Sequence, residues 1–280
     1  MEFDLKIQLV TDSSANLTCM TNCNFSSAAL KVIIGADEFT DNESIDLPAM
    51  MQTLKQHKGK TSTACPSVED WLKAFGEADV VLGAAITSNL SGCYNSAMVA
   101  AKEYTDKHPD RKVFILDSLS TGPELELLME RLQEMISRDM PFEEICAGIE
   151  EYSSRTHLQF SLESLENFAR NGRVNPAVAK AVGVLGIRIV GRASDVGTLE
   201  PMHKCRGEKK AIQCLYDSML AAGYNGGKVR IAHTNNLKFA TALTSLLTAS
   251  FPNCDISIRE NRGLCSYYAE NGGVLVGYEA

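Results

Sequence analysis

The sequence has no long hydrophobic run. Its longest stretches of apolar residues and glycine, such as VVLGAAI at 80–86, are far shorter than the ~18 to 20 residues that a membrane-spanning helix requires. The first ten residues, MEFDLKIQLV, carry acids where a secretory signal carries basic residues. We therefore expect a cytoplasmic protein without a membrane span.

Positive charge is also in short supply. The chain has 27 Lys and Arg against 35 Asp and Glu, a net charge of −8, which argues against a general nucleic-acid-binding protein because such proteins need basic surface. Residues 170–230 are an exception, with eleven Lys and Arg against four Asp and Glu. Runs of charge are usually solvated surface, and the alternative is a docking face for an anionic partner or a phosphate.

Several catalytic and metal-binding patterns are missing. The sequence lacks GxSxG, HExxH, GxGxxG and GxxxxGK, and none of its five histidines stands beside a candidate nucleophile. The nine cysteines are an odd number, and the closest pair, Cys19 and Cys23, has no second Cys or His pair nearby to complete a zinc site. We expect reduced thiols, no metal and no cofactor.

What the sequence does contain is typical of a globular α/β protein. The chain has 280 residues, 45% apolar and 22% charged, which suits two domains. In the first half, short apolar runs alternate with amphipathic helical patterns, an arrangement that predicts a parallel sheet covered on both faces. The apolar runs are at 7–11, 30–35, 80–87 and 112–117, and the helical patterns are at 47–57, 67–78, 91–106, 123–137 and 141–155.

The pattern changes near residue 155. We predict a three-layer α/β/α domain at 1–155 and a smaller two-layer α/β domain with a mixed sheet at 156–280. In the second domain, strands are expected at 157–162, 228–234, 254–260 and 272–280, and helices at 207–223 and 237–251.

Polar loops follow the predicted strands of the first domain. Three of them are 11–14, 87–91 and 117–121, and a fourth, TSTACPS, is at 61–67. The carboxyl ends of parallel strands share one edge, where ligands bind, and helix N-termini at that edge favour anions. Each loop alone is explained by helix capping. Together they predict a site for a small anionic group, and Gly92 would allow a ligand to approach the backbone closely.

Several sequence blocks, spread over nearly the whole chain, form a specific pattern through their order and spacing rather than through any one of them. They are VTDSSANL at 10–17, TACPS at 63–67, ITSNLSGCYNSA at 86–97, VFILDSLSTG at 113–122, LENFARNGRV at 165–174, GTLEPMHKCRGEKKA at 197–211 and IAHTNN at 231–236. With these blocks the chain resembles the DegV family of fatty-acid-binding proteins.

The resemblance implies a carrier that holds one long-chain fatty acid in a tunnel between two domains. Thr63 and Ser91 match the family positions that meet the carboxylate, and the weaker candidates nearby are Ser62, Ser88, Asn89 and Asn95. Arg173 and Arg206 match arginines that resemble a docking surface for a separate ATP-using fatty-acid kinase. That kinase would phosphorylate the bound acid, so this chain would not itself be an enzyme.

The sequence departs from the family pattern near its C-terminus. Ala269 stands where the family has the histidine of an H-x-G-P-G block, and Ala64 and Cys65 replace a serine and a glutamine. Two alternatives to a carrier stay open. One is a small hydrolase or acyl transferase that uses Ser91 or a cysteine at the same loop edge, and the other is a regulatory module that binds a protein through the basic 170–230 segment.

Overall fold

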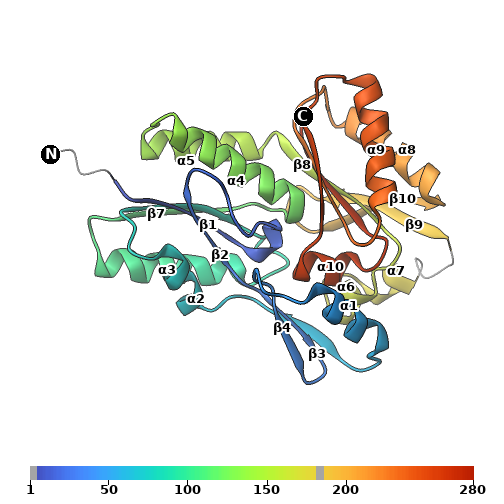
Figure 1. The fold of residues 1–280 in the computed structure, drawn as a ribbon, viewed down its shortest axis with the longest axis horizontal. Coiled ribbons are helices and arrows are strands. Elements are labelled where there is room, and N and C mark those ends of the chain that lie inside the picture. Colours follow the sequence, from blue (N-terminus) through green and yellow to red (C-terminus); the bar gives the residue numbers. More distant parts are fainter. Residues whose placement is uncertain (1–4, 181–185) are drawn as a thin grey trace.

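The first half of the chain is a three-layer α/β/α unit, as predicted (Figure 1). The computed structural model describes residues 5–180 and 186–280. Four parallel strands have the order β2-β1-β6-β7. Their bounds are Ile7–Asp12 for β1, Asn24–Ala28 for β2, Val80–Ala85 for β6 and Lys112–Asp117 for β7.

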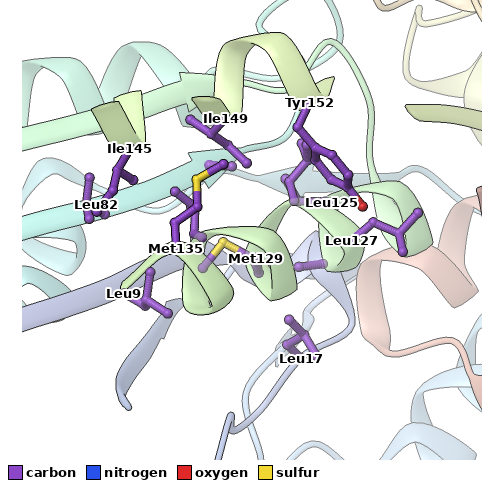
Figure 2. Packing of buried hydrophobic residues seen from close by; sticks show 14 of the residues in the cluster. Leu9, Leu17, Leu82, Leu125, Leu127, Met129, Met135, Ile145, Ile149 and Tyr152 are labelled. Atoms are coloured by element: carbon purple, nitrogen blue, oxygen red, sulfur yellow. The ribbon is translucent and has the colours of Figure 1, made fainter. Parts of the chain in front are cut away.

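Helices cover both faces of this sheet. Helices α2 (Val68–Phe75) and α3 (Cys93–Lys107) pack on one face, and α4 (Gly122–Ser137) and α5 (Phe142–Ser153) pack on the other. Figure 2 shows the second of these cores, in which Leu9 and Leu82 of the sheet meet Met129 of α4 and Ile149 of α5. Successive strand residues point to opposite faces, which explains why β6, buried along its whole length, is apolar on both sides.

The start of α2 follows directly from local sequence. The Ser67 hydroxyl accepts a hydrogen bond from the Asp70 backbone N–H at 3.1 Å, and the Asp70 carboxylate accepts one from the Ser67 N–H at 2.9 Å. This reciprocal capping box satisfies two backbone donors that a helix N-terminus leaves free.

A small antiparallel sheet corrects two of the predictions. Its order is β4-β3-β5, with β3 at Lys31–Ile34, β4 at Asp37–Thr40 and β5 at Thr61–Ala64. The run 30–35 was expected in the parallel sheet, but Val32 and Ile34 pack instead against helix α1 (Leu47–Gln56) and Tyr267. The polar strand β2 occupies the sheet edge in its place, and residues 61–64 are a strand rather than a loop.

The second half contains a six-stranded mixed sheet with the order β10-β9-β8-β13-β11-β12. Among the described residues of this sheet, only β11 and β12 pair in parallel. Helices α8 (Glu208–Ala221) and α9 (Leu237–Ser250) cover one face, and the first half of the chain lies over the other (Figure 1). The strands are β8 (Thr156–Leu162), β9 (Ile187–Ala193), β10 (Leu199–Arg206), β11 (Val229–His233), β12 (Ile256–Glu260) and β13 (Val274–Glu279). The mixed sheet confirms the predicted fold class, and the domain boundary at 155 stays a prediction.

Three short helices that the periodicity did not predict lie near the junction of the two halves. They are α6 (Glu166–Arg170), α7 (Pro176–Lys180) and α10 (Gly263–Ala269). The Asp41 carboxylate accepts hydrogen bonds from the Gly263 and Leu264 N–H groups at 2.9 and 2.8 Å, so the N-terminus of α10 is capped by a residue from the first half. Across the described ranges, we find no helix with the length and apolar character needed to cross a bilayer.

Helix α4 joins the two halves through charged side chains. Arg230 of β11 forms a two-pronged ion pair with Glu130, both contacts at 2.8 Å, and Arg259 of β12 contacts the buried Glu126 at 2.5 Å. Glu124, in the first turn, accepts hydrogen bonds from the hydroxyls of Ser120 and Thr156. These contacts hold α4 of the first half against the sheet of the second.

Candidate functional site

Three of the predicted polar loops meet at the carboxyl edge of the parallel sheet. The Ile86 N–H donates to Asp12 at 2.7 Å, the Thr87 N–H to the Ser120 carbonyl at 2.9 Å, and the Ser88 N–H to Asp117 at 3.1 Å. Because the ends of β1, β6 and β7 are bonded to each other in this way, the expectation that these loops converge is confirmed.

Much of the polarity at this edge is structural. Both carboxylate oxygens of Asp12 accept backbone N–H groups, from Ser14 and Ile86, and burial raises the pKa of Asp12 to about 6. The Ser13 hydroxyl accepts the Leu30 N–H at 3.0 Å. Asp12 and Ser13 therefore fix the strand ends and do not line the cavity described next.

A cavity of about 320 Å³ lies between the two halves of the chain. The second half contributes an apolar wall from β8, β10, α10 and β13, and the first half contributes Leu30, Ile86 and the strand-end loops. The apolar wall consists of Leu158, Phe160, Leu162, Leu199, Leu264 and Leu275. Such a lining suits an alkyl chain.

Four polar residues lie close together in the lining of this cavity. The Thr63 hydroxyl on β5 is 3.0 Å from the hydroxyl of Tyr268 on α10. Arg173 donates from Nε to the Leu90 carbonyl at 3.2 Å, which places its guanidinium beside Ser91. All four of Thr63, Ser91, Arg173 and Tyr268 contact the cavity. The cavity thus combines an apolar wall with a cluster of three hydroxyls and the Arg173 guanidinium.

The electrostatics of this cluster favour an anion. Burial raises the pKa of Tyr268, so the phenol is a neutral hydrogen-bond donor at ordinary pH. The ring of Tyr268 packs against Phe168 with centroids 4.7 Å apart, which holds the hydroxyl in place. Arg173 supplies the positive charge, since arginine stays protonated in proteins.

The structure separates the remaining predicted site residues from this cluster. Ser88 uses its N–H on Asp117, and Asn89 donates from Nδ2 to the Val196 carbonyl of the second half at 2.8 Å. Ser62 alternates with Thr63 along β5 and so points to the other face of its sheet, while Asn95 on α3 and Arg206 on β10 are exposed. None of these five lines the cavity in the described part of the chain.

Sequence reasoning missed Tyr268. It precedes Ala269, the residue that replaces the family histidine, and both line the cavity. The segment SYYA carries no motif, and only its pairing with Thr63, 205 residues earlier, reveals a role. Gly92 lines the cavity as well, and a Cβ at that position would meet the Cys65 sulfur at 3.2 Å.

Two further predictions concern the histidines and the cysteines. His233 is buried at the end of β11, and its Nδ1 accepts the Asn236 N–H at 3.3 Å, so it is a satisfied strand-end histidine. All nine cysteines are free. Among the residues that the structure places, no group of three or more His, Cys, Asp or Glu could hold a metal ion.

Comparisons with known proteins agree with this architecture. The family model described as "Uncharacterised protein, DegV family" matches residues 6–280. A DegV domain-containing protein of Streptococcus pneumoniae is 40% identical over 276 residues, which are 97% of this chain and 98% of the relative.

Similar solved structures come from the same family. A DegV family protein from Eubacterium eligens loaded with heptadecanoic acid has a TM-score of 0.96 and 41% identity, covering 98% of this chain and 99% of that one. The fatty acid kinase (Fak) B3 protein of Streptococcus pneumoniae loaded with linoleic acid has a TM-score of 0.95 and 39% identity, with the same coverage. The chain therefore belongs to the DegV family.

Proposed function

We propose that this protein binds one long-chain fatty acid in the cavity between its two halves and serves as a carrier. The observation that carries the proposal is the cavity itself, which joins an apolar wall to a cluster of Thr63, Ser91, Arg173 and Tyr268. The fatty acids bound by the Eubacterium eligens and Streptococcus pneumoniae proteins support the same ligand class.

The energetics favour a lipid over a small polar ligand. Burial of each methylene contributes ~0.8 kcal/mol, so a chain of about sixteen carbons gains on the order of 10 kcal/mol before the costs of ordering. The polar cluster then has only to hold one carboxylate. Ionised carboxylates form short, strong hydrogen bonds with such donors.

In this proposal the polar residues have different tasks. The Ser91 hydroxyl would donate to the carboxylate, together with whichever of the Thr63 and Tyr268 hydroxyls accepts the hydrogen bond between them. The Arg173 guanidinium would balance the charge of the carboxylate. Cys93 donates its N–H to the Ser91 hydroxyl oxygen at 3.3 Å, which leaves the Ser91 proton free to point at a ligand. Ser62, Ser88, Asn89 and Asn95 have no part in this arrangement.

We further propose that the bound acid is presented to a separate ATP-dependent fatty-acid kinase. The support is the similarity to the fatty acid kinase (Fak) B3 protein and the basic segment that contains the exposed Arg206. In this scheme Arg173 is a ligand of the carboxylate as well as part of a docking face. The kinase performs the phosphoryl transfer, and this chain performs no chemistry.

Solvent extraction of the purified protein followed by mass spectrometry tests the carrier function. We expect about one long-chain acid per chain, and delipidated protein should show a rise in melting temperature on addition of hexadecanoic acid. Thr63→Val and Ser91→Ala should each weaken binding of the acid about tenfold, the cost of one hydrogen bond to a charged group. Ser88→Ala is the matched control and should bind normally.

Two outcomes would contradict the proposal. Protein that carries no acyl chain and shows no thermal response to added fatty acids is not a fatty-acid carrier. Hydrolysis of an ester or acyl phosphate without a kinase, abolished by Ser91→Ala, would instead establish the hydrolase alternative.

A further inference from the structure

A second cavity, of about 520 Å³, lies on the other face of the six-stranded sheet, against α8. Successive residues of β8 alternate between the two cavities. Leu158 and Phe160 line the cavity between the two halves, which we call the acyl cavity, and His157 and Gln159 line the second cavity. The second cavity has a largely apolar lining with a few polar side chains, among them Ser218 of α8 and Tyr278 of β13.

The two cavities meet where the pairing of β8 and β9 ends. The last pair of this ladder is Gln159 with Arg192, and within the described chain the β8 residues before Gln159 pair with β13 alone. Leu158, Arg192 and Ala193 line both cavities. The strands are therefore not hydrogen-bonded to each other beside Leu158 and Ala193, which are residues common to both cavities.

The second cavity contains a buried amide with an unused hydrogen-bonding atom. Gln159 is 2% exposed, and its Nε2 donates to the Tyr278 hydroxyl at 2.9 Å. Its Oε1 has no hydrogen-bond partner among the described residues. Reversing the amide would leave the nitrogen unpaired instead. A ligand hydroxyl suits either orientation, because it can donate and accept.

The charges around this cavity favour a neutral group over a second carboxylate. Arg192 is the only Lys or Arg among the described lining residues, and it forms ion pairs with Glu200 at 2.7 Å and with Asp195 at 3.3 Å. His157 and His203 also line the cavity, and burial, together with the nearby Arg192, lowers the pKa of His157. Asp217 adds a carboxylate to the lining, which disfavours a ligand anion.

We propose that the acyl cavity continues between Leu158 and Ala193 into the second cavity, and that the protein accepts fatty acids with a hydroxyl on the distal part of the chain. Gln159 holds that hydroxyl, and the carboxylate stays at the Thr63 cluster. This inference rests on the proposed function and narrows its ligand class. An unsubstituted chain would leave the Gln159 amide unpaired.

Competition binding on delipidated protein tests this proposal. In this assay, hexadecanoic acid, its terminal hydroxy analogue and its dicarboxylic analogue are each titrated against a bound fluorescent fatty acid. We expect the hydroxy acid to bind within about threefold of hexadecanoic acid, and the diacid to bind at least about tenfold more weakly. Gln159→Leu should weaken the hydroxy acid about tenfold, or ~1.4 kcal/mol, and leave hexadecanoic acid unchanged.

Two more variants separate this effect from a loss of folding. Ser218→Phe fills the second cavity from α8, so it should weaken the hydroxy acid more than hexadecanoic acid, because only the hydroxy acid also loses the hydrogen bond to Gln159. Gln52→Leu, on the exposed side of α1, should change neither affinity.

The proposal is overturned if Gln159→Leu affects both acids equally or neither of them. It is also overturned if the wild-type protein binds the hydroxy acid more than about a hundredfold more weakly than hexadecanoic acid. Failure of the wild-type protein to bind hexadecanoic acid would instead reject the fatty-acid carrier itself.

Discussion

Replacing Glu124 with glutamine should stabilise the protein at alkaline pH. Glu124 is 5% exposed, and within residues 5–180 and 186–280 its two carboxylate oxygens accept hydrogen bonds from Ser120 and Thr156 only. Burial raises the pKa of this carboxyl from 4.5 to about 7. Above pH 7 the folded protein must therefore keep a buried charge that no cation balances directly. A glutamine has the same shape and can bond both hydroxyls without that charge.

The size of the effect follows from the pKa. A carboxyl whose pKa moves from 4.5 to about 7 loses about 3 kcal/mol of folding free energy on ionisation, at ~1.4 kcal/mol per pH unit. Glu124 lies in the first turn of α4, where the helix dipole stabilises the ionised carboxylate by roughly 0.3 to 1 kcal/mol. The net gain from Glu124→Gln at pH 8 is thus about 2 to 3 kcal/mol.

The sign of the pH dependence is fixed by the direction of the pKa change. The protonated carboxyl favours folding below pH 4.5, and this contribution is lost as the pH rises through 7. The difference between variant and wild type should accordingly shrink to less than about 1 kcal/mol at pH 5.

Thermal unfolding of delipidated protein at pH 8 and pH 5 measures the difference. The melting temperature of Glu124→Gln should exceed that of wild type by on the order of 5 to 10 °C at pH 8. Glu144→Gln, on the exposed side of α5, is the control and should show no change. Equal destabilisation by Glu124→Gln at both pH values would refute the argument, since it would mean that the carboxylate is stabilising in its ionised form.

Three other substitutions test parts of the fold near the site. Gly197→Ala should speed release of a bound fatty acid in a stopped-flow assay, because Gly197 has φ +72° and an added Cβ would lie 2.2 Å from the Thr87 hydroxyl; an unchanged release rate would contradict this. Asp41→Asn should lower the free energy of unfolding in urea by about 1 to 3 kcal/mol, because one of two buried N–H groups loses its acceptor, and a neutral result would show that this cap is dispensable. Gly83→Ala should lower it by at least about 2 kcal/mol, since the new Cβ would lie 2.1 Å from the Val10 carbonyl oxygen; retention of wild-type stability would mean that the two strands can move apart.

The parts of the fold that could be predicted are those with a local cause. The capping box at Ser67 and Asp70, the apolar strands at 80–87 and 112–117 and the long amphipathic helices all depend on near neighbours in sequence. The strand-end loops could be placed together because parallel strands end at one edge.

The errors have non-local causes. Strand β2, NFSSA, is too polar to be recognised, and it becomes a strand because β1 pairs with its backbone. The α10 helix is almost wholly buried, so it lacks an amphipathic pattern, and its cap is Asp41, more than 200 residues earlier. Sequence reasoning missed Tyr268 because its role, too, depends on a distant part of the chain. Its partner Thr63 is distant in sequence, and no spacing rule relates the two.

The wall of the acyl cavity is shared between the two halves of the chain, and this has a thermodynamic consequence. A ligand that touches both halves binds only the folded molecule, so fatty-acid binding and folding are thermodynamically linked. At a free acid concentration one hundred times the dissociation constant, the loaded protein resists unfolding by about 2.7 kcal/mol more than the empty one. Resistance to heat or protease would therefore serve as a gauge of how much of the protein is loaded.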